Sequence, residues 1–351
     1  MSIDIICDVI DNFGDAGVCL RLGRDLAVKG KKVRIFCNNI DAINRITTTN
    51  DLGMIGIFEW PECKNTYEAS EVIIQAFSVR LPKCMMEKVK EKKSLIINIE
   101  YLTAEKFAED CHKLPSYADG LESFFFFPGF TEKTGSVVIE DSLRKKIKDN
   151  ENKSQNNISV FSYENNKLLL LINKLNKINS EFKFLIFEGK SLNIFNKQTK
   201  LNLKPYEQIH FKDIKVNALK MVNHEEYDDI LIKSSINLVR GEDSIVRAML
   251  VGKPFLWNIY PTDDNAHFDK INALFDIMKE KLELKKEIDI LRNITLSYNG
   301  FSDYLENFDF LDFYDIWKNL SSKWSEYLLS HDSLTNNLLS FIGEKLSKDD
   351  K

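Results

Sequence analysis

The chain has 351 residues, of which 44% are hydrophobic and 29% charged, and its formal net charge is −5. This length predicts about two domains of ordinary size, and the negative charge argues against general binding to nucleic acid, which needs a basic surface. No basic segment followed by an apolar core stands at the N-terminus, and no apolar run is long enough to span a bilayer. We therefore expect a cytoplasmic protein with no membrane partner.

The first half of the chain alternates short apolar runs with amphipathic stretches. Strands are predicted at 3–10, 33–37, 54–58, 72–75, 95–99 and 124–127, and helices at 18–28, 82–91 and 104–110. Strands that alternate with helices indicate a mostly parallel sheet with both faces covered.

The most distinctive loop follows the first predicted strand, at 8–17, and reads Asp-Val-Ile-Asp-Asn-Phe-Gly-Asp-Ala-Gly. Asp11 and Asp15 stand on either side of Gly14 at the carboxyl end of that strand, where open α/β sheets bind their ligands. A phosphate-binding turn would be rich in glycine and free of carboxylates, because the two groups repel. The loop therefore predicts a negative pocket that holds a cation or accepts a proton.

Residues 140–157 are polar and lack apolar periodicity, which predicts a linker. A second alternating series follows, with strands at 158–161, 184–187, 219–222, 236–239 and 255–257 and helices at 167–177, 225–233 and 244–251; after Asp264 the chain reads as helical. Two such domains facing across a cleft would give a bilobal glycosyltransferase, although any two-domain α/β protein would show the same pattern.

A second distinctive turn lies between the predicted strand 236–239 and the helix after it. Asp243 and Ser244 are good helix-capping residues, Gly241 permits a tight approach, and Arg240 adds a cation. With the free N–H groups of the helix start, these features suit a diphosphate, while Glu242 and Asp243 suit sugar or ribose hydroxyls. An ordinary capped helix, with Arg240 paired to a neighbouring carboxylate, would give the same sequence.

Aromatic residues follow the first strand of the second half and precede the Arg240 turn. Phe161 and Tyr163 could stack on a nucleobase, and His224 and Tyr227 stand at a similar strand end. A place for Phe161 in the hydrophobic core is the alternative.

Several common motifs are missing from the sequence. It has no Walker loop and no Gly-x-Gly-x-x-Gly, which argues against ATP and NAD, and its five histidines show no metal-ligand spacing. The six cysteines form no Cys-x-x-Cys pair, which predicts reduced thiols. We therefore expect neither a cofactor nor a metal site.

Several blocks of sequence, in order along most of the chain, resemble the elongation factor P arginine rhamnosyltransferase family (EarP). They are Asp-Asn-Phe-Gly-Asp-Ala-Gly at 11–17, Tyr-Leu-Thr-Ala-Glu at 101–105, Leu-Pro-Ser at 114–116, Phe-Phe-Phe-Pro-Gly-Phe-Thr at 125–131, Arg-Gly-Glu-Asp-Ser at 240–244, Gly-Lys-Pro-Phe at 252–255 and Ile-Tyr-Pro at 259–261. The linker and the part after Asp264 resemble the family less.

The resemblance implies an α/β protein of GT-B glycosyltransferase architecture, with two Rossmann-like domains facing across a cleft. Residues 1–148 would bind the acceptor, 149–157 would be the linker, 158–332 would bind the nucleotide sugar, and a helix at about 333–347 would pack back on the first domain. The implied reaction moves L-rhamnose from dTDP-β-L-rhamnose to an arginine of elongation factor P, with inversion and without a metal.

By the same resemblance, Asp15 is the general base, Asp11 its partner carboxylate and Glu242 an essential glutamate. The donor-binding residues would be Phe161, Tyr163, His224, Tyr227, Arg240, Gly241, Asp243 and Ser244, and the acceptor-binding residues Asn12, Phe13, Gly14 and Tyr101. The sequence departs from the family at two positions: His224 replaces a frequent glutamine, and Leu20 replaces a typical tryptophan.

Two other functions fit parts of this pattern. One is a different metal-independent GT-B enzyme that uses a nucleotide sugar for a cell-surface acceptor. The other is a non-catalytic binding protein that keeps the nucleotide-sugar fold, although such a protein would not need the Asp11 and Asp15 pair.

Overall fold

The structure is a computed structural model that describes residues 1–9, 14–60, 67–117, 120–150 and 155–349. It divides into two compact units: unit 1 holds Met1–Glu140 and His331–Lys351, and unit 2 holds Asp141–Ser330. Unit 2 begins with helix α6 (Asp141–Asp149), so the segment expected to be a linker starts as a helix. Leu143 and Ile147 lie one helical turn apart and form a short apolar face on α6, and Leu143 is buried. The residues between them are charged, which hides this face in the sequence.

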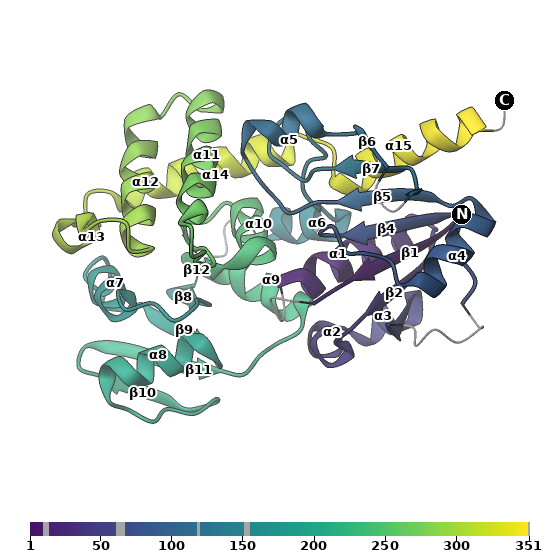
Figure 1. Ribbon diagram of the computed structural model, residues 1–351. Helices are drawn as coiled ribbons and strands as arrows, with labels where there is room; N and C mark the ends of the chain where they lie inside the picture. The colour runs from purple at the N-terminus through teal and green to yellow at the C-terminus, as the bar shows by residue number, and fades with distance from the viewer. Residues whose placement is uncertain (10–13, 61–66, 118–119, 151–154, 350–351) are drawn as a thin grey trace. The chain divides into compact units, whose positions relative to one another are not determined.

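Unit 1 is built on a seven-stranded sheet in the order β3-β2-β1-β4-β5-β7-β6 (Figure 1). The strands are β1 (Ser2–Cys7), β2 (Lys32–Cys37), β3 (Ile55–Glu59), β4 (Val72–Ala76), β5 (Leu95–Ile99), β6 (Pro115–Ser116) and β7 (Ser123–Phe126). All neighbouring strands are parallel except β6 and β7. The strand order reverses between β1 and β4, and open α/β sheets bind ligands at the carboxyl ends of strands at such a switch point.

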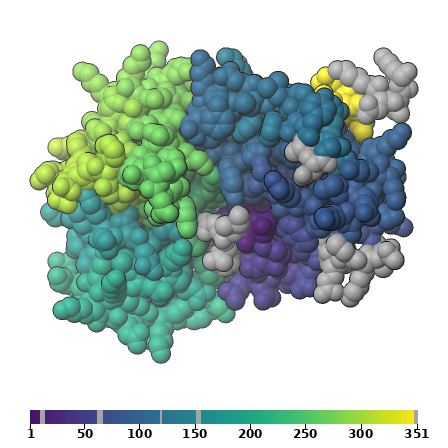
Figure 2. All heavy atoms as spheres, in the orientation of Figure 1, coloured from purple at the N-terminus to yellow at the C-terminus, as the bar shows by residue number. Residues whose placement is uncertain are grey.

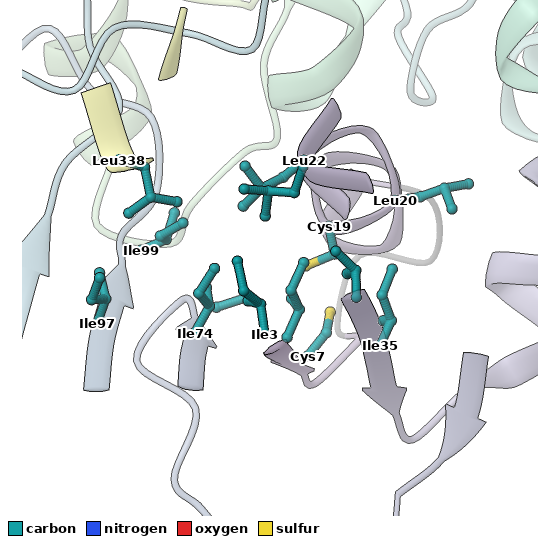
Figure 3. Packing of buried hydrophobic residues seen from close by; sticks show 14 of the residues in the cluster. Ile3, Cys7, Cys19, Leu20, Leu22, Ile35, Ile74, Ile97, Ile99 and Leu338 are labelled. Carbon is teal, nitrogen blue, oxygen red and sulfur yellow. The ribbon is translucent and has the colours of Figure 1, made fainter. Parts of the chain in front are cut away.

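Helices cover both faces of this sheet, and they are α1 (Gly14–Val28), α2 (Ile40–Ile46), α3 (Thr49–Met54), α4 (Lys83–Lys92), α5 (Lys106–Cys111) and α15 (Leu334–Asp349). Side chains of β1 alternate between the faces: Ile3 and Cys7 join the core beneath α1, while Ile6 joins the core beneath α4. Figure 3 shows the core beneath α1, with Cys7 and Cys19 facing each other. Leu20, at the position of the family tryptophan, is fully buried.

Helix α15 comes from the end of the chain and packs in unit 1. Leu334, Leu338, Phe341 and Ile342 are buried in the same core as Ile97, Ile99, Phe124 and Phe126 of β5 and β7. Figure 3 shows Leu338 beside Ile97 and Ile99. The backbone N–H of Leu334 also donates a hydrogen bond to the carbonyl of Val137 (2.8 Å).

Unit 2 has a six-stranded sheet in the order β10-β11-β9-β8-β12-β13, with only the β10–β11 pair antiparallel. The strands are β8 (Asn157–Val160), β9 (Lys183–Phe187), β10 (Gln208–Phe211), β11 (Ile214–Leu219), β12 (Ile236–Arg240) and β13 (Phe255–Asn258). The strand order reverses between β8 and β12, so this sheet has its own switch point.

The helices of unit 2 after α6 are α7 (Leu168–Asn176), α8 (Lys190–Thr199), α9 (His224–Lys233), α10 (Gly241–Val251), α11 (Ala266–Lys281), α12 (Lys285–Tyr298), α13 (Tyr304–Asn307) and α14 (Tyr314–Leu329). In the space-filling view, side chains of α11 and α12 form part of the surface of this unit (Figure 2).

The strand predicted at 219–222 is wrong, because β11 ends at Leu219. The true strand alternates buried and half-buried residues from Ile214, and the apolar pair after it leads into α9. There the N–H of Met221 donates to the Glu188 carboxylate (2.8 Å), which replaces a ladder hydrogen bond.

Within the part of the chain that the structure describes, no helix has both the length and the apolar character needed to cross a bilayer.

The cysteines differ in oxidation state. Cys7, Cys19, Cys37 and Cys111 are free thiols. Cys84 is disulfide-bonded, so the prediction of reduced thiols is wrong there, because a spacing test cannot detect a bridge that the fold creates.

Candidate active site

The predicted catalytic aspartate lies at the switch point of unit 1. Gly14 and Asp15 are the first two residues of α1, and the Asp15 side chain is only 4% exposed. The positive end of the helix dipole favours a negative charge at this position. Helix α1 begins four residues earlier than the sequence pattern predicted, which places Asp15 in the first helical turn rather than in the loop. Asp11, Asn12 and Phe13 lie outside the described residues.

The connection from β1 to α1 is held at its start by Asn38, which follows β2. The Asn38 side chain accepts a hydrogen bond from the N–H of Val9 (2.8 Å) and donates one to the Asp8 carboxylate. Beneath it, a hydrogen bond with Cys19 raises the pKa of the Cys7 thiol far above its usual range, and burial and the charge of Asp15 act in the same direction. The Cys7 thiol is therefore protonated and unreactive.

Tyr101 lies at the same edge of the sheet, two residues after β5. Its ring stacks on that of Phe77, with the ring centroids 4.4 Å apart and the planes 14° from parallel. Tyr101 keeps 38% of its surface exposed. Unit 1 therefore places Gly14, Asp15 and Tyr101 along one edge.

The switch point of unit 2 is organised by Arg240, the last residue of β12. Its guanidinium carbon lies 4.2 Å from the ring centroid of Phe161 and 5.0 Å from that of Tyr163, both of which follow β8. Phe161 is 7% and Tyr163 4% exposed, so both rings support the cation from within the fold. The Phe161 ring also packs against Phe187 and Tyr227.

The turn after Arg240 depends on Gly241. Gly241 has φ +64°, a conformation that favours glycine. Its carbonyl accepts a hydrogen bond from the indole N–H of Trp257 (2.9 Å), which fixes the turn. Arg240 is the N-cap residue of α10 and makes no side-chain capping hydrogen bond. The cap is therefore not Asp243 or Ser244 as predicted, and both lie in the first turn of the helix.

Helix α9 brings two more predicted residues to this turn. It begins with a capping box in which Asn223 and Glu226 satisfy each other's backbone N–H groups. This start places His224 Nε2 4.0 Å from Asp243 Oδ2. His224 is 5% exposed, and Tyr227 packs in the aromatic cluster around Phe161. The predicted donor residues thus stand at or after the carboxyl ends of β8, β11 and β12 in unit 2.

Glu242 has a partner that the sequence did not reveal. Lys270 of α11 lies with its Nζ 3.4 Å from Glu242 Oε1, and both side chains are partly exposed. This ion pair joins the start of α10 to a helix nearly thirty residues further along the chain. A lysine on a helix with an ordinary amphipathic pattern gives no sequence signal for that contact.

Three further residues at this edge were missed by sequence reasoning. Lys190 Nζ lies 5.0 Å from the Tyr163 ring centroid, the Tyr260 ring packs edge-on against Tyr163 at 5.4 Å, and Asn258 Oδ1 accepts the Tyr163 N–H (2.9 Å). Gly189 and Lys190 come two and three residues after β9, so a glycine and a lysine after a predicted strand were the available signal. Tyr260 belongs to the Ile-Tyr-Pro block at 259–261.

Each unit can therefore perform a distinct part of a reaction. The edge of unit 1 offers a buried carboxylate that can hold a cation or accept a proton. The edge of unit 2 offers a fixed guanidinium, a helix N-terminus and aromatic rings, which suit a nucleoside diphosphate. Among the described residues, no group of three or more His, Cys, Asp or Glu side chains is arranged to hold a metal ion.

The chain matches one protein family along nearly its whole length. The family model for elongation factor P (EF-P) rhamnosyltransferase EarP matches residues 3–343. The protein-arginine rhamnosyltransferase of Pseudomonas aeruginosa is 30% identical, over 98% of this chain and 100% of that protein. The enzyme of the same name from Pseudomonas putida is 32% identical, over 77% of this chain and 79% of that protein.

Solved structures show the same fold. One is reported as the structural basis for EarP-mediated arginine glycosylation of translation elongation factor EF-P; it has a TM-score of 0.68 at 21% identity and covers 98% of this chain and 99% of that chain. The glycosyltransferase VinC in complex with dTDP has a TM-score of 0.51 at 11% identity, over 97% and 98% of the two chains. These likenesses confirm the predicted GT-B glycosyltransferase fold. From the family match and the relatives together, the chain belongs to the EarP family, whose named members are protein-arginine rhamnosyltransferases.

Proposed function

We propose that this protein-arginine rhamnosyltransferase moves L-rhamnose from dTDP-β-L-rhamnose to an arginine of elongation factor P, with inversion and without a metal ion. The observation that carries the proposal is the buried Asp15 carboxylate in the first turn of α1, at the switch point of unit 1. It stands in a chain that belongs to the EarP family.

Arginine is a demanding nucleophile, because its guanidinium is protonated at cellular pH and its lone pairs are delocalised. The enzyme must hold the cation, orient one terminal nitrogen and remove a proton as the new bond forms. Asp15 accepts that proton, and a second carboxylate aligns the guanidinium through charge-assisted hydrogen bonds. By the resemblance, that second carboxylate is Asp11.

In the proposed step, the guanidinium nitrogen attacks the anomeric carbon while the bond from that carbon to the diphosphate oxygen breaks. The proton passes to Asp15 and dTDP leaves with the electron pair. A single in-line displacement of this kind inverts the configuration, so an α-linked rhamnose is the expected product.

The donor site supplies the stabilisation that the leaving diphosphate needs. Arg240 is held by two aromatic rings, and the α10 N-terminus with Ser244 lies directly after it. These groups are fixed before the reaction and oppose the charge that develops on the diphosphate. Because the diphosphate is already a weak base, it needs no general acid.

Glu242 binds the sugar rather than the phosphates in this proposal, because a carboxylate repels a diphosphate. The 3.4 Å ion pair with Lys270 holds the Glu242 side chain in one orientation at the start of α10. Tyr163, Tyr227 and His224 contact the base or its ribose.

The test is transfer with purified elongation factor P and dTDP-rhamnose, followed by intact mass and peptide mapping. We expect a mass gain of one deoxyhexose on one arginine, an α-linkage by NMR of the glycopeptide, and unchanged activity in excess EDTA. An acceptor variant with lysine at that arginine is the control and should gain nothing. Activity lost in EDTA and restored by Mg²⁺ would disprove the metal-free mechanism.

The same assay separates the alternatives. A transferase for a cell-surface acceptor would hydrolyse or use the donor but leave elongation factor P unmodified. A non-catalytic binding protein would bind dTDP without any turnover. Because the proposed acceptor is a translation factor, we place the reaction in the cytoplasm.

A further inference from the structure

Three neighbouring strands of unit 1 end at the same level. Pairing aligns Ile6 of β1 with Gln75 of β4, and Gln75 with Asn98 of β5. The residues that follow these strands, Asp8, Phe77 and Glu100, therefore lie at the same carboxyl edge of the sheet. Since adjacent strands lie 4.7–4.9 Å apart, Glu100 is two strand spacings, about 10 Å, from the β1 position.

The segment after β4 adopts an uncommon backbone conformation at this edge. Phe77 has φ +59° and Ser78 has φ +56°, and neither is glycine. Two consecutive residues of this kind carry a conformational cost that the surroundings must offset, and such strain gathers at binding and catalytic sites. The N–H of Phe77 is meanwhile held by the Ile99 carbonyl (2.6 Å).

This conformation organises Glu100 and Tyr101. It directs the Phe77 ring onto the Tyr101 ring, at 4.4 Å between centroids, and it lets Ser78 Oγ donate a hydrogen bond to Glu100 Oε1 (2.7 Å). The Glu100 side chain is only partly exposed, and burial raises its pKa above the usual value while the Ser78 hydrogen bond opposes that shift.

A partly buried carboxylate beside an exposed aromatic ring is suited to one kind of ligand. A lysine or arginine side chain can stack its charged end on the ring and donate hydrogen bonds to the carboxylate. The approach of a cation also relieves the cost of burying the Glu100 charge.

We propose that Glu100, with Tyr101 beside it, binds a second cationic side chain of the acceptor protein, distinct from the arginine that is modified. This inference rests on the proposed function and deepens it, because it gives unit 1 a recognition site about 10 Å along the sheet edge from the β1 end. Phe77 and Ser78 are positioning residues that hold the ring and the carboxylate. The site would select acceptors that carry a second lysine or arginine near the modified arginine.

The first test is Glu100→Gln, which keeps the size and the acceptor oxygen for Ser78 but removes the charge. With elongation factor P varied at saturating dTDP-rhamnose, we expect the acceptor KM to rise roughly 5- to 50-fold. We expect kcat and the Kd for dTDP to stay unchanged, because the contact is made equally in the ground and transition states. Glu68→Gln, an exposed glutamate before β4 at the opposite edge, should keep the wild-type KM.

The second test identifies the partner residue. Each lysine and arginine around the modified arginine of elongation factor P is changed to glutamine and assayed with both enzymes. One of these acceptor changes should raise the KM of the wild-type enzyme but raise the KM of the Glu100→Gln enzyme little further. Such non-additivity indicates a direct contact between the two residues. Tyr101→Leu, with its dTDP affinity intact, should also raise the acceptor KM.

A wild-type acceptor KM in Glu100→Gln would overturn the inference, as would strictly additive effects for every acceptor substitution. A loss of dTDP affinity in Glu100→Gln would also overturn it, because it would show a general disturbance of the fold. Failure of the proposed function looks different, since the wild-type enzyme itself would then leave elongation factor P unmodified.

Discussion

The carboxylate of Asp228 and the guanidinium of Arg247 form a two-pronged ion pair between α9 and α10. The Nε–Oδ1 distance is 3.1 Å and the Nη2–Oδ2 distance is 2.9 Å, and the two side chains are 9% and 1% exposed. One helix carries His224 and Tyr227, and the other carries the Gly241–Ser244 turn. The pair therefore fixes α9 and α10, which carry residues proposed to bind the donor, to each other.

We predict that Asp228→Asn lowers the free energy of unfolding by about 3–5 kcal/mol, because it leaves the Arg247 cation buried without its charged partner. The dTDP affinity should fall with it as α9 and α10 separate. Urea unfolding and calorimetric titration with dTDP measure the two effects. Asp229→Asn is the matched control, since the neighbouring Asp229 pairs with Lys146 at the surface and should cost less than about 1 kcal/mol. Equal effects of the two variants would contradict the prediction.

Asp15→Asn should reduce transfer by roughly 10²- to 10⁴-fold, the usual contribution of a positioned general base. Its dTDP affinity should stay close to wild type, because Asp15 lies in unit 1 and the residues proposed to bind the donor lie in unit 2. Rates come from the mass assay, and affinity comes from calorimetry. Asp41→Asn changes an exposed carboxylate in the first turn of α2 and should leave the rate unchanged. A large loss of dTDP affinity in Asp15→Asn would place Asp15 in the donor site instead.

Most strands could be predicted from the sequence, because the strands of parallel sheets are continuous apolar runs that stand out between polar turns. The core strands β1, β5 and β12 all lie within or close to their predicted ranges. The half-buried strand β11 and the short helix α6 could not be predicted in this way. β11 alternates along Ile214–Leu219, and α6 has only Leu143 and Ile147 as an apolar face among charges.

The candidate site could be predicted where its residues follow strands in the sequence. Arg240 and Phe161 are examples, since both stand at ends of predicted strands. What could not be predicted is contact between distant segments. The Lys270–Glu242 pair and the Trp257 hydrogen bond to Gly241 arise only when α11 and β13 are packed in place. The left-handed backbone of Phe77 and Ser78 could not be predicted either, because neither residue type favours that conformation.

Arg240→Lys keeps the charge but loses the planar group that lies over Phe161 and Tyr163. We expect the Kd for dTDP to rise roughly 2- to 30-fold, the range of a cation–π contact of about 0.5–2 kcal/mol. Calorimetric titration with dTDP measures this change. Arg292→Lys alters a surface ion pair of unit 2 and should leave the Kd unchanged. An Arg240→Lys enzyme with wild-type affinity would show that charge alone binds the diphosphate.

His112 makes the stability of unit 1 depend on pH. Its Nδ1 accepts the N–H of Phe127 (3.1 Å), and burial lowers its pKa from 6.5 to about 4. The unfolded chain therefore binds a proton at higher pH than the folded one, so this contribution to stability is present above pH 6.5 and is lost as the pH falls towards 4. Urea unfolding across this range should show a shallower pH dependence for His112→Gln than for wild type. Parallel curves would mean that His112 does not contribute.

Phe341→Ala should destabilise unit 1 although it lies near the end of the chain. Phe341 is 4% exposed, and its ring packs against Phe124 of β7 at 5.6 Å and Phe126 at 5.9 Å. Removing a buried phenylalanine costs about 3–5 kcal/mol, because it loses apolar contacts and leaves a cavity. Hydrogen exchange should therefore accelerate at β5 and β7 and stay unchanged at β8 and β12, which belong to unit 2. Asn336→Ala, on the exposed face of α15, should leave exchange as in wild type. Faster exchange confined to unit 2 would contradict the packing of α15 in the core of unit 1.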